Sequence, residues 1–136
     1  MPIESDAGLR EVLGLQTVAV IGCSRHPGKD AHDVPAYLQV HGYTVIPVNP
    51  NADTVLGRSA YDSLGAVDEQ VDVVEVFRPS DEVAGIVDEA LARDDVRVIW
   101  TQRGIVDHAA ARRAEAGGLR VVQDRCMKVE HRRLVG

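Results

Sequence analysis

Short runs of aliphatic residues alternate with amphipathic segments along most of the chain. Each run is four to seven residues long and rich in valine and isoleucine. Short, nearly continuous apolar runs are typical of strands that are buried on both faces of a parallel sheet. The runs predict strands at Thr17–Ile21, 43–48, 71–77, 96–100 and 119–122.

The segments between these runs carry helix signals. An apolar stripe predicts a helix over 8–15. Proline is tolerated only in a first helical turn, so Pro35 indicates a helix capped by Asp33 or a close neighbour, which Gly42 then ends. Further helices are predicted after Pro79, over 108–116 and, as a turn or two, in the tail, with a short one near 63–67 inside the turn-rich connection 49–67.

Strands that alternate with helices indicate βαβ units and a parallel sheet. The pattern therefore predicts an α/β protein with a Rossmann-like, doubly wound, mainly parallel five-stranded sheet and helices on both faces. A chain of 136 residues suits one hydrophobic core, so residues 1–136 are expected to form a single domain.

Composition and charge narrow the range of partners. The chain is 45% hydrophobic and carries a formal net charge of −6, which argues against a nucleic-acid surface. Neither a signal peptide nor an apolar stretch long enough to span a bilayer is evident, so no membrane partner is expected and the cytoplasm is the expected location. Both cysteines are interpreted as thiols, and the histidines lack metal-ligand spacing.

Ligands of such sheets bind beyond the carboxyl ends of the strands, where the strand order reverses. The first of these ends continues into the loop "GCSRHPGKD". Gly22 permits a tight turn close to an anion, Ser24 adds a hydroxyl, and the next helix offers its positive N-terminal end. With the charges of Arg25 and Lys29, this loop predicts phosphate binding.

The type of phosphate compound follows from what the strand ends lack. A nicotinamide dinucleotide site requires G-x-G-x-x-G and an acidic residue at the end of strand two. This chain has G-C-S-R-H-P-G in the first loop, and Asn49 and Pro50 in place of the acid. NAD is therefore disfavoured, whereas the adenosine phosphate of NADP or of coenzyme A remains open.

Several segments together resemble one family. They are "VAVIGCSRHPGKDAHDVPAYLQVHGYTVIPVNPN", "VDVVEVFRP", "VIWTQRGI" and "DRCMKVEH". In combination they are similar to the small stand-alone CoA-binding proteins, which resemble the N-terminal domain of the succinyl-CoA ligase alpha subunit. The resemblance covers 17–134. It implies a Rossmann-type domain that holds the ADP part of coenzyme A or acyl-CoA and has no chemistry of its own.

The resemblance also implies a binding site. Gly22, Cys23, Ser24, Arg25 and Lys29 would surround the phosphates, Val48, Asn49 and Pro50 would lie beside the adenosine, and Phe77 and Arg78 would lie across the cleft. We add Gln102 and Cys126, which follow the last two strands.

We therefore expect non-catalytic binding of coenzyme A or acyl-CoA, with no catalytic residues and no metal. One alternative is an NADP-dependent oxidoreductase in which Arg25, Lys29 or Arg58 reads the extra phosphate; another is a regulatory subunit that senses acyl-CoA. Nearby cations favour thiolates, so one hypothesis is that a cysteine forms a mixed disulfide with coenzyme A, Cys126 in preference to Cys23. The alternative, which the frequent burial of cysteine favours, is that both cysteines are packing residues.

Overall fold

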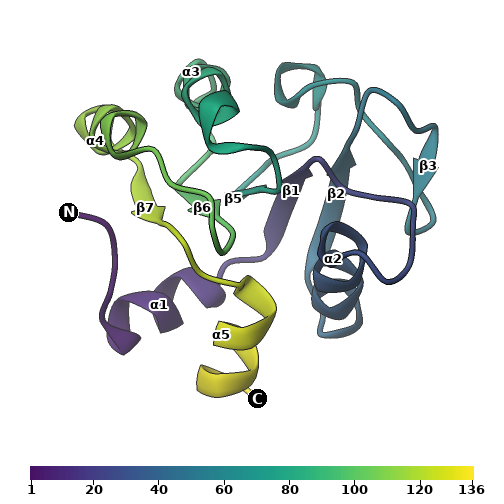
Figure 1. The fold of residues 1–136 in the computed structure, drawn as a ribbon, viewed down its shortest axis with the longest axis horizontal. Helices are drawn as coiled ribbons and strands as arrows, with labels where there is room; N and C mark the ends of the chain where they lie inside the picture. The colour runs from purple at the N-terminus through teal and green to yellow at the C-terminus, as the bar shows by residue number, and fades with distance from the viewer.

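The computed structural model describes residues 1–136 and contains a five-stranded parallel sheet (Figure 1). The strands lie in the order β2-β1-β5-β6-β7. The chain passes from β1 to β2 at one edge and then returns to β5 on the other side of β1. The strand order thus reverses between β1 and β5. The bounds are β1 Thr17–Ile21, β2 Thr44–Val48, β5 Val73–Val76, β6 Val98–Thr101 and β7 Arg120–Val122.

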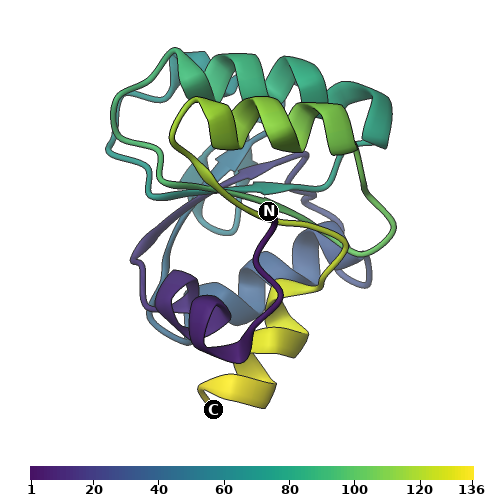
Figure 2. The same cartoon turned by 90° about the vertical axis from the view of Figure 1, so that its left-hand side faces the viewer.

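Helices cover both faces of this sheet (Figure 2). The helices α3 (Val83–Leu91) and α4 (His108–Ala116) lie on one face. The other face carries α1 (Asp6–Leu13), α2 (Asp30–Val40) and α5 (Met127–Leu134). Successive strand residues point to opposite faces, so two separate cores form, one on each side. The predicted fold class is confirmed.

The predicted start of α2 was wrong. The helix begins at Asp30 after Lys29, and Asp33 lies in its first turn instead of capping it. Pro35 is tolerated further inside because the carbonyl of Ala31, which its missing N–H leaves free, accepts the N–H of Ser24 at 2.9 Å. The loop after β1 therefore compensates for the proline in the helix.

The connection after β2 contains more structure than predicted. The two-residue strands β3 (Thr54–Val55) and β4 (Arg58–Ser59) form a small antiparallel hairpin. Leu56 and Gly57 both have positive φ, as a two-residue hairpin turn requires. The short helix expected here is present as the 3-10 helix η1 (Leu64–Ala66).

The remaining boundaries differ from the predictions by a few residues. The segment after Pro79 begins with the 3-10 helix η2 (Ser80–Glu82) before α3. The tail forms the two-turn helix α5. No helix reaches the length and apolarity needed to cross a membrane. The extent of the domain, residues 1–136, stays a prediction.

Candidate functional site

A hollow of about 550 Å³ lies at the carboxyl ends of β1, β2 and β5, beside the point where the strand order reverses. We call it the β1 pocket. Three separate stretches of the chain supply most of its lining. The predicted site residues among them are Gly22, Ser24, Lys29, Val48, Asn49, Pro50, Phe77 and Arg78.

Gly22 is required where the ends of β1 and β5 approach each other. Its φ is +85°, and a Cβ atom there would lie 2.9 Å from Cδ of Arg78 and 3.2 Å from the carbonyl oxygen of Phe77. Its N–H donates to Val48 O at 2.9 Å, and the Phe77 N–H donates to Ile21 O at 2.9 Å. These bonds hold the ends of the neighbouring strands close to Gly22. No space is left at this position for a side chain.

Hydrogen bonds within the loop after β1 fix its shape. The N–H of His26 donates to Oγ of Ser24 at 3.0 Å. The N–H of Gly28 donates to Oδ1 of Asp33 at 3.1 Å. The N–H groups of Cys23 and Arg25 have no acceptor in the protein. The loop is therefore ordered without a ligand.

Asn49 ties the loops after β1 and β2 together. Its Nδ2 donates to the carbonyl of Cys23 at 2.9 Å, and its Oδ1 accepts the N–H of Asn51 at 2.8 Å. Both ends of the amide are thus engaged within the protein. The position where a dinucleotide site would hold an acidic residue is occupied by a bridge between two loops.

The two cationic side chains of the β1 pocket differ in whether an acidic residue pairs with them. Nη2 of Arg78 lies 2.7 Å from Oε2 of Glu82, and this bond raises the pKa of the arginine and lowers the pKa of the glutamate. Lys29 has no ion-pair partner in the protein. Lys29 is accordingly the cation of this pocket that is available to an anionic ligand.

Two predicted residues of the first loop do not line the pocket. The side chain of Arg25 is exposed and does not line the β1 pocket. The side chain of Cys23 is completely buried in the core beneath α2. Burial, with a smaller contribution from the nearby Glu75 carboxylate, raises the pKa of Cys23 to about 12. The expectation of a reactive thiolate at Cys23 was therefore wrong.

Gln102 and Cys126 lie in a second hollow of about 380 Å³ between the N-terminal ends of α2 and α5, the α2–α5 pocket. Oε1 of Gln102 accepts the N–H of Met127 at 3.1 Å and so holds the first turn of α5. Cys126 is the half-buried N-cap residue of that helix. Phe77 lines both this pocket and the β1 pocket, so the two are adjacent.

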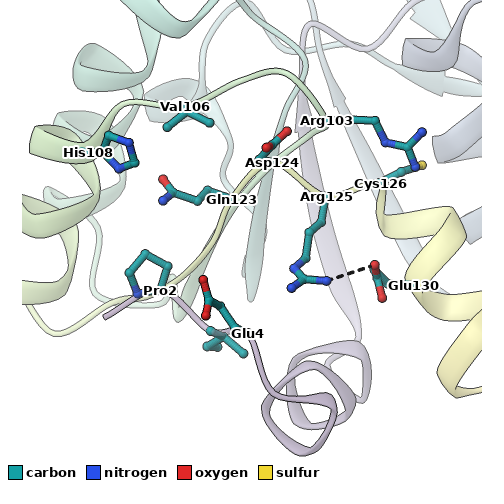
Figure 3. A pocket seen from close by; sticks show the side chains of 11 residues that line it. Pro2, Glu4, Arg103, Val106, His108, Gln123, Asp124, Arg125, Cys126 and Glu130 are labelled. Atoms are coloured by element: carbon teal, nitrogen blue, oxygen red, sulfur yellow. Dashed lines mark hydrogen bonds and ion pairs between the residues drawn. The ribbon is translucent and has the colours of Figure 1, made fainter.

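A third hollow, of about 450 Å³, lies at the ends of β6 and β7 and was not predicted (Figure 3). We call it the β7 pocket. The N-terminal segment forms one of its walls because the Ile3 N–H donates to Val121 O at 2.8 Å. No spacing in the sequence links these distant segments. The lining comprises Pro2, Ile3, Glu4, Arg103, Val106, His108, Gln123, Asp124, Arg125, Cys126 and Glu130.

Glu75 is a further polar residue that sequence reasoning missed. It lies in the middle of β5, is completely buried, and neither carboxyl oxygen has a hydrogen-bond partner. Burial raises its pKa to about 8, so the protonated form predominates at neutral pH. The position of Glu75 inside the apolar run "VDVVEVF" was the signal in the sequence that could have identified it. No group of three or more His, Cys, Asp or Glu side chains is arranged to hold a metal ion.

Comparison with known proteins assigns the chain to a protein family. Residues 16–132 match the model of the CoA binding domain family. The match covers most of the 136 residues, and the chain belongs to that family.

Two similar proteins of comparable length support this. The chain is 38% identical over 128 residues to the uncharacterized protein YneT of Bacillus subtilis (strain 168), covering 93% of this chain and 94% of YneT. The solved structure of a hypothetical protein from Pyrococcus horikoshii OT3 superposes with a TM-score of 0.93 at 36% identity, covering 100% of this chain and 97% of that one.

A larger protein contains a similar segment. The ADP-forming acetate–CoA ligase II of Archaeoglobus fulgidus is 36% identical over 86 residues, which is 62% of this chain. The matched part is only 12% of the ligase. The likeness therefore concerns one segment of that enzyme.

Proposed function

We propose that this protein binds coenzyme A or an acyl-CoA, with the ADP part in the β1 pocket, and has no catalysis of its own. The observation that carries the proposal is the convergence of eight predicted site residues, from three separate stretches of the chain, on one pocket beside the reversal of strand order. Family membership supports coenzyme A as the ligand.

The chemistry of the β1 pocket suits the ADP part. The ammonium of Lys29 and the N-terminal end of α2 are the donors for the phosphates. Val48 and Pro50 provide apolar surface for the adenine. The pantetheine arm crosses Phe77 into the α2–α5 pocket, which brings the thiol toward Cys126.

The side chains of these pockets support binding more than catalysis. A nucleophile needs a base within hydrogen-bond reach. The buried thiol of Cys23 has its pKa raised to about 12, and Cys126 has no hydrogen bond to a histidine or a carboxylate. The carboxyl of Glu75 lies outside every pocket described above.

Cys126 is nevertheless the cysteine suited to a mixed disulfide with coenzyme A. Its thiolate attacks the disulfide of oxidised coenzyme A, which forms the protein–CoA disulfide and releases one coenzyme A thiolate. No other oxidant is required. The half-buried position of Cys126 between two pockets supports this assignment, whereas Cys23 is buried.

The NADP alternative has weaker support. The amide of Asn49 is engaged by Cys23 and Asn51. Arg58 is paired with Glu69 at 2.6 Å and lies outside the β1 pocket. Neither residue is positioned to read a nicotinamide dinucleotide.

Isothermal titration calorimetry with coenzyme A, dephospho-CoA, NAD and NADP tests the proposal. We expect coenzyme A to bind more tightly than NADP, and NAD to give no measurable heat. Tighter binding of NADP than of coenzyme A would contradict the proposed function.

A further inference from the structure

The three pockets form a row along the carboxyl edge of the sheet. Phe77 lines both the β1 pocket and the α2–α5 pocket. Arg103 and Cys126 line both the α2–α5 pocket and the β7 pocket. The row follows the order of the strands from β2 to β7. An extended ligand that begins in the first pocket therefore has a path to the third.

We propose that the β7 pocket is a subsite for the acyl group of a CoA thioester, and that it selects short acyl groups carrying oxygen beyond the thioester. This inference rests on the proposed function. The thiol lies at the far end of coenzyme A from the adenosine, and Cys126 marks the junction where that end leaves the α2–α5 pocket. Whatever is attached to the thiol next enters the β7 pocket.

Hydrogen-bonding groups without partners determine the chemical class of the acyl group. Neither the amide of Gln123 nor the imidazole of His108 has a hydrogen-bond partner in the protein. Arg125 donates through Nη1 to Oε1 of Glu130 at 3.3 Å, which leaves the other guanidinium donors free. Figure 3 shows these side chains around one hollow, opposite Glu4. Hydroxyl oxygens would satisfy these donors, whereas a carboxylate would also face the Glu4 carboxylate in the same hollow.

An unsubstituted alkyl chain does not suit the same surface. The apolar side chains of the lining are limited to Pro2, Ile3, Val106 and Cys126. An alkyl chain placed there would displace water from Gln123 and Arg125 without replacing its hydrogen bonds, and that desolvation is unfavourable. Selection therefore depends on polarity beyond the thioester more than on chain length.

Calorimetry with acyl-CoA compounds of equal carbon number tests the inference. The probes are butyryl-CoA, 3-hydroxybutyryl-CoA and succinyl-CoA, with coenzyme A as the reference and octanoyl-CoA as the long apolar probe. We expect 3-hydroxybutyryl-CoA to bind roughly threefold to tenfold more tightly than butyryl-CoA. Succinyl-CoA should gain less, because its carboxylate meets the charge of Glu4. Octanoyl-CoA is expected to bind no more tightly than butyryl-CoA.

A pair of identical substitutions locates the effect. Gln123→Leu should remove most of the preference for the oxygenated compounds and leave the affinity for coenzyme A unchanged. Gln70→Leu, at an exposed position outside all three pockets, is the matched control and should preserve the preference. His108→Ala is an independent variant at the start of α4, and should reduce the preference even if Gln123→Leu fails to fold.

The outcomes separate this inference from the proposed function. If coenzyme A binds and the acyl compounds of equal carbon number bind with equal affinity, the acyl subsite is overturned and coenzyme A binding stands. Tighter binding of octanoyl-CoA than of 3-hydroxybutyryl-CoA also overturns it. If no CoA compound binds, the proposed function fails, and this inference fails with it.

Discussion

The loops after β1 and β7 share a sequence context but differ in structure. Each follows a buried aliphatic strand, contains one cysteine and leads into a helix on the same face of the sheet. In the first loop the backbone is fixed by internal hydrogen bonds and Cys23 is buried. In the second loop Cys126 is half-buried between two pockets.

Basic neighbours in the sequence are therefore not sufficient to make a cysteine reactive. Burial keeps Cys23 protonated, although Arg25 and Lys29 are close in sequence. Internal hydrogen bonds fix the backbone of the first loop, whereas the second loop places its cysteine where two pockets meet. The predictions below test this contrast, beginning with the largest expected effect.

The first loop should tolerate no side chain at Gly22. Gly22→Ala combines a φ of +85° with a contact at 2.9 Å to Arg78, so we expect a loss of about 2 to 4 kcal/mol in the free energy of unfolding. Gly28→Ala shares the positive φ but has open space around its Cβ position, and should cost about half as much. Urea unfolding of both variants measures the difference. Equal losses would show that the close approach to Arg78 is unimportant.

The core beneath the first loop should make stability depend on pH. The pKa of Glu75 is about 8 in the folded protein, above the usual 4.5 of a glutamate, so the folded state binds the proton more tightly than the unfolded state. The free energy of unfolding should therefore fall as pH rises from about 4.5 to about 8. The loss is on the order of 2 to 4 kcal/mol.

Glu75→Gln removes this titration while keeping the size of the side chain. Urea unfolding of the variant and the wild-type protein at pH values across that range gives the measurement. The difference in stability between them should change with pH in the direction stated above. A constant difference would mean that Glu75 does not titrate in this interval.

The charge that meets the phosphates should be that of Lys29 and not that of Arg25. Lys29→Ala is expected to weaken coenzyme A binding about tenfold, because a charge-assisted phosphate contact is lost. Arg25→Ala, four residues away and outside the pocket, should leave the affinity within about twofold. Calorimetry on the two variants checks this, and the reverse ranking would move the phosphate site toward Arg25.

The smallest effect on reversible binding is expected at the second loop. Cys126→Ser should leave coenzyme A affinity nearly unchanged but abolish the adduct formed with oxidised coenzyme A. Cys23→Ser should retain the adduct, since Cys23 is buried. Intact-mass measurement before and after reduction detects the adduct. An adduct that persists in Cys126→Ser would assign the reaction to Cys23 and contradict the contrast between the loops.

Much of the fold was predictable because its strands are runs of Val and Ile that alternate with helices, which indicates βαβ units and a parallel sheet. The hairpin 54–59 was not, because strands of two residues leave no alternation to detect. The start of α2 was misplaced because the hydrogen bond from Ser24 to Ala31, which accommodates Pro35, joins residues whose contact the sequence does not reveal.

The candidate site also contains residues that were predictable from the sequence and features that were not. Gly22, Asn49 and Phe77 were predictable because each follows the end of a strand. The burial of Cys23 and the wall that the N-terminal segment adds to the β7 pocket depend on tertiary packing, which local spacing does not encode.

The most direct test of the central claim is a map of backbone amide NMR shifts during titration with coenzyme A. The account predicts that the largest shifts arise at Gly22, Asn49 and Phe77, with smaller shifts at Cys126, where the pantetheine arm ends. Shifts concentrated elsewhere, with the amides of Gly22 and Asn49 unchanged at saturation, would contradict the claim that the β1 pocket holds the ADP part of coenzyme A.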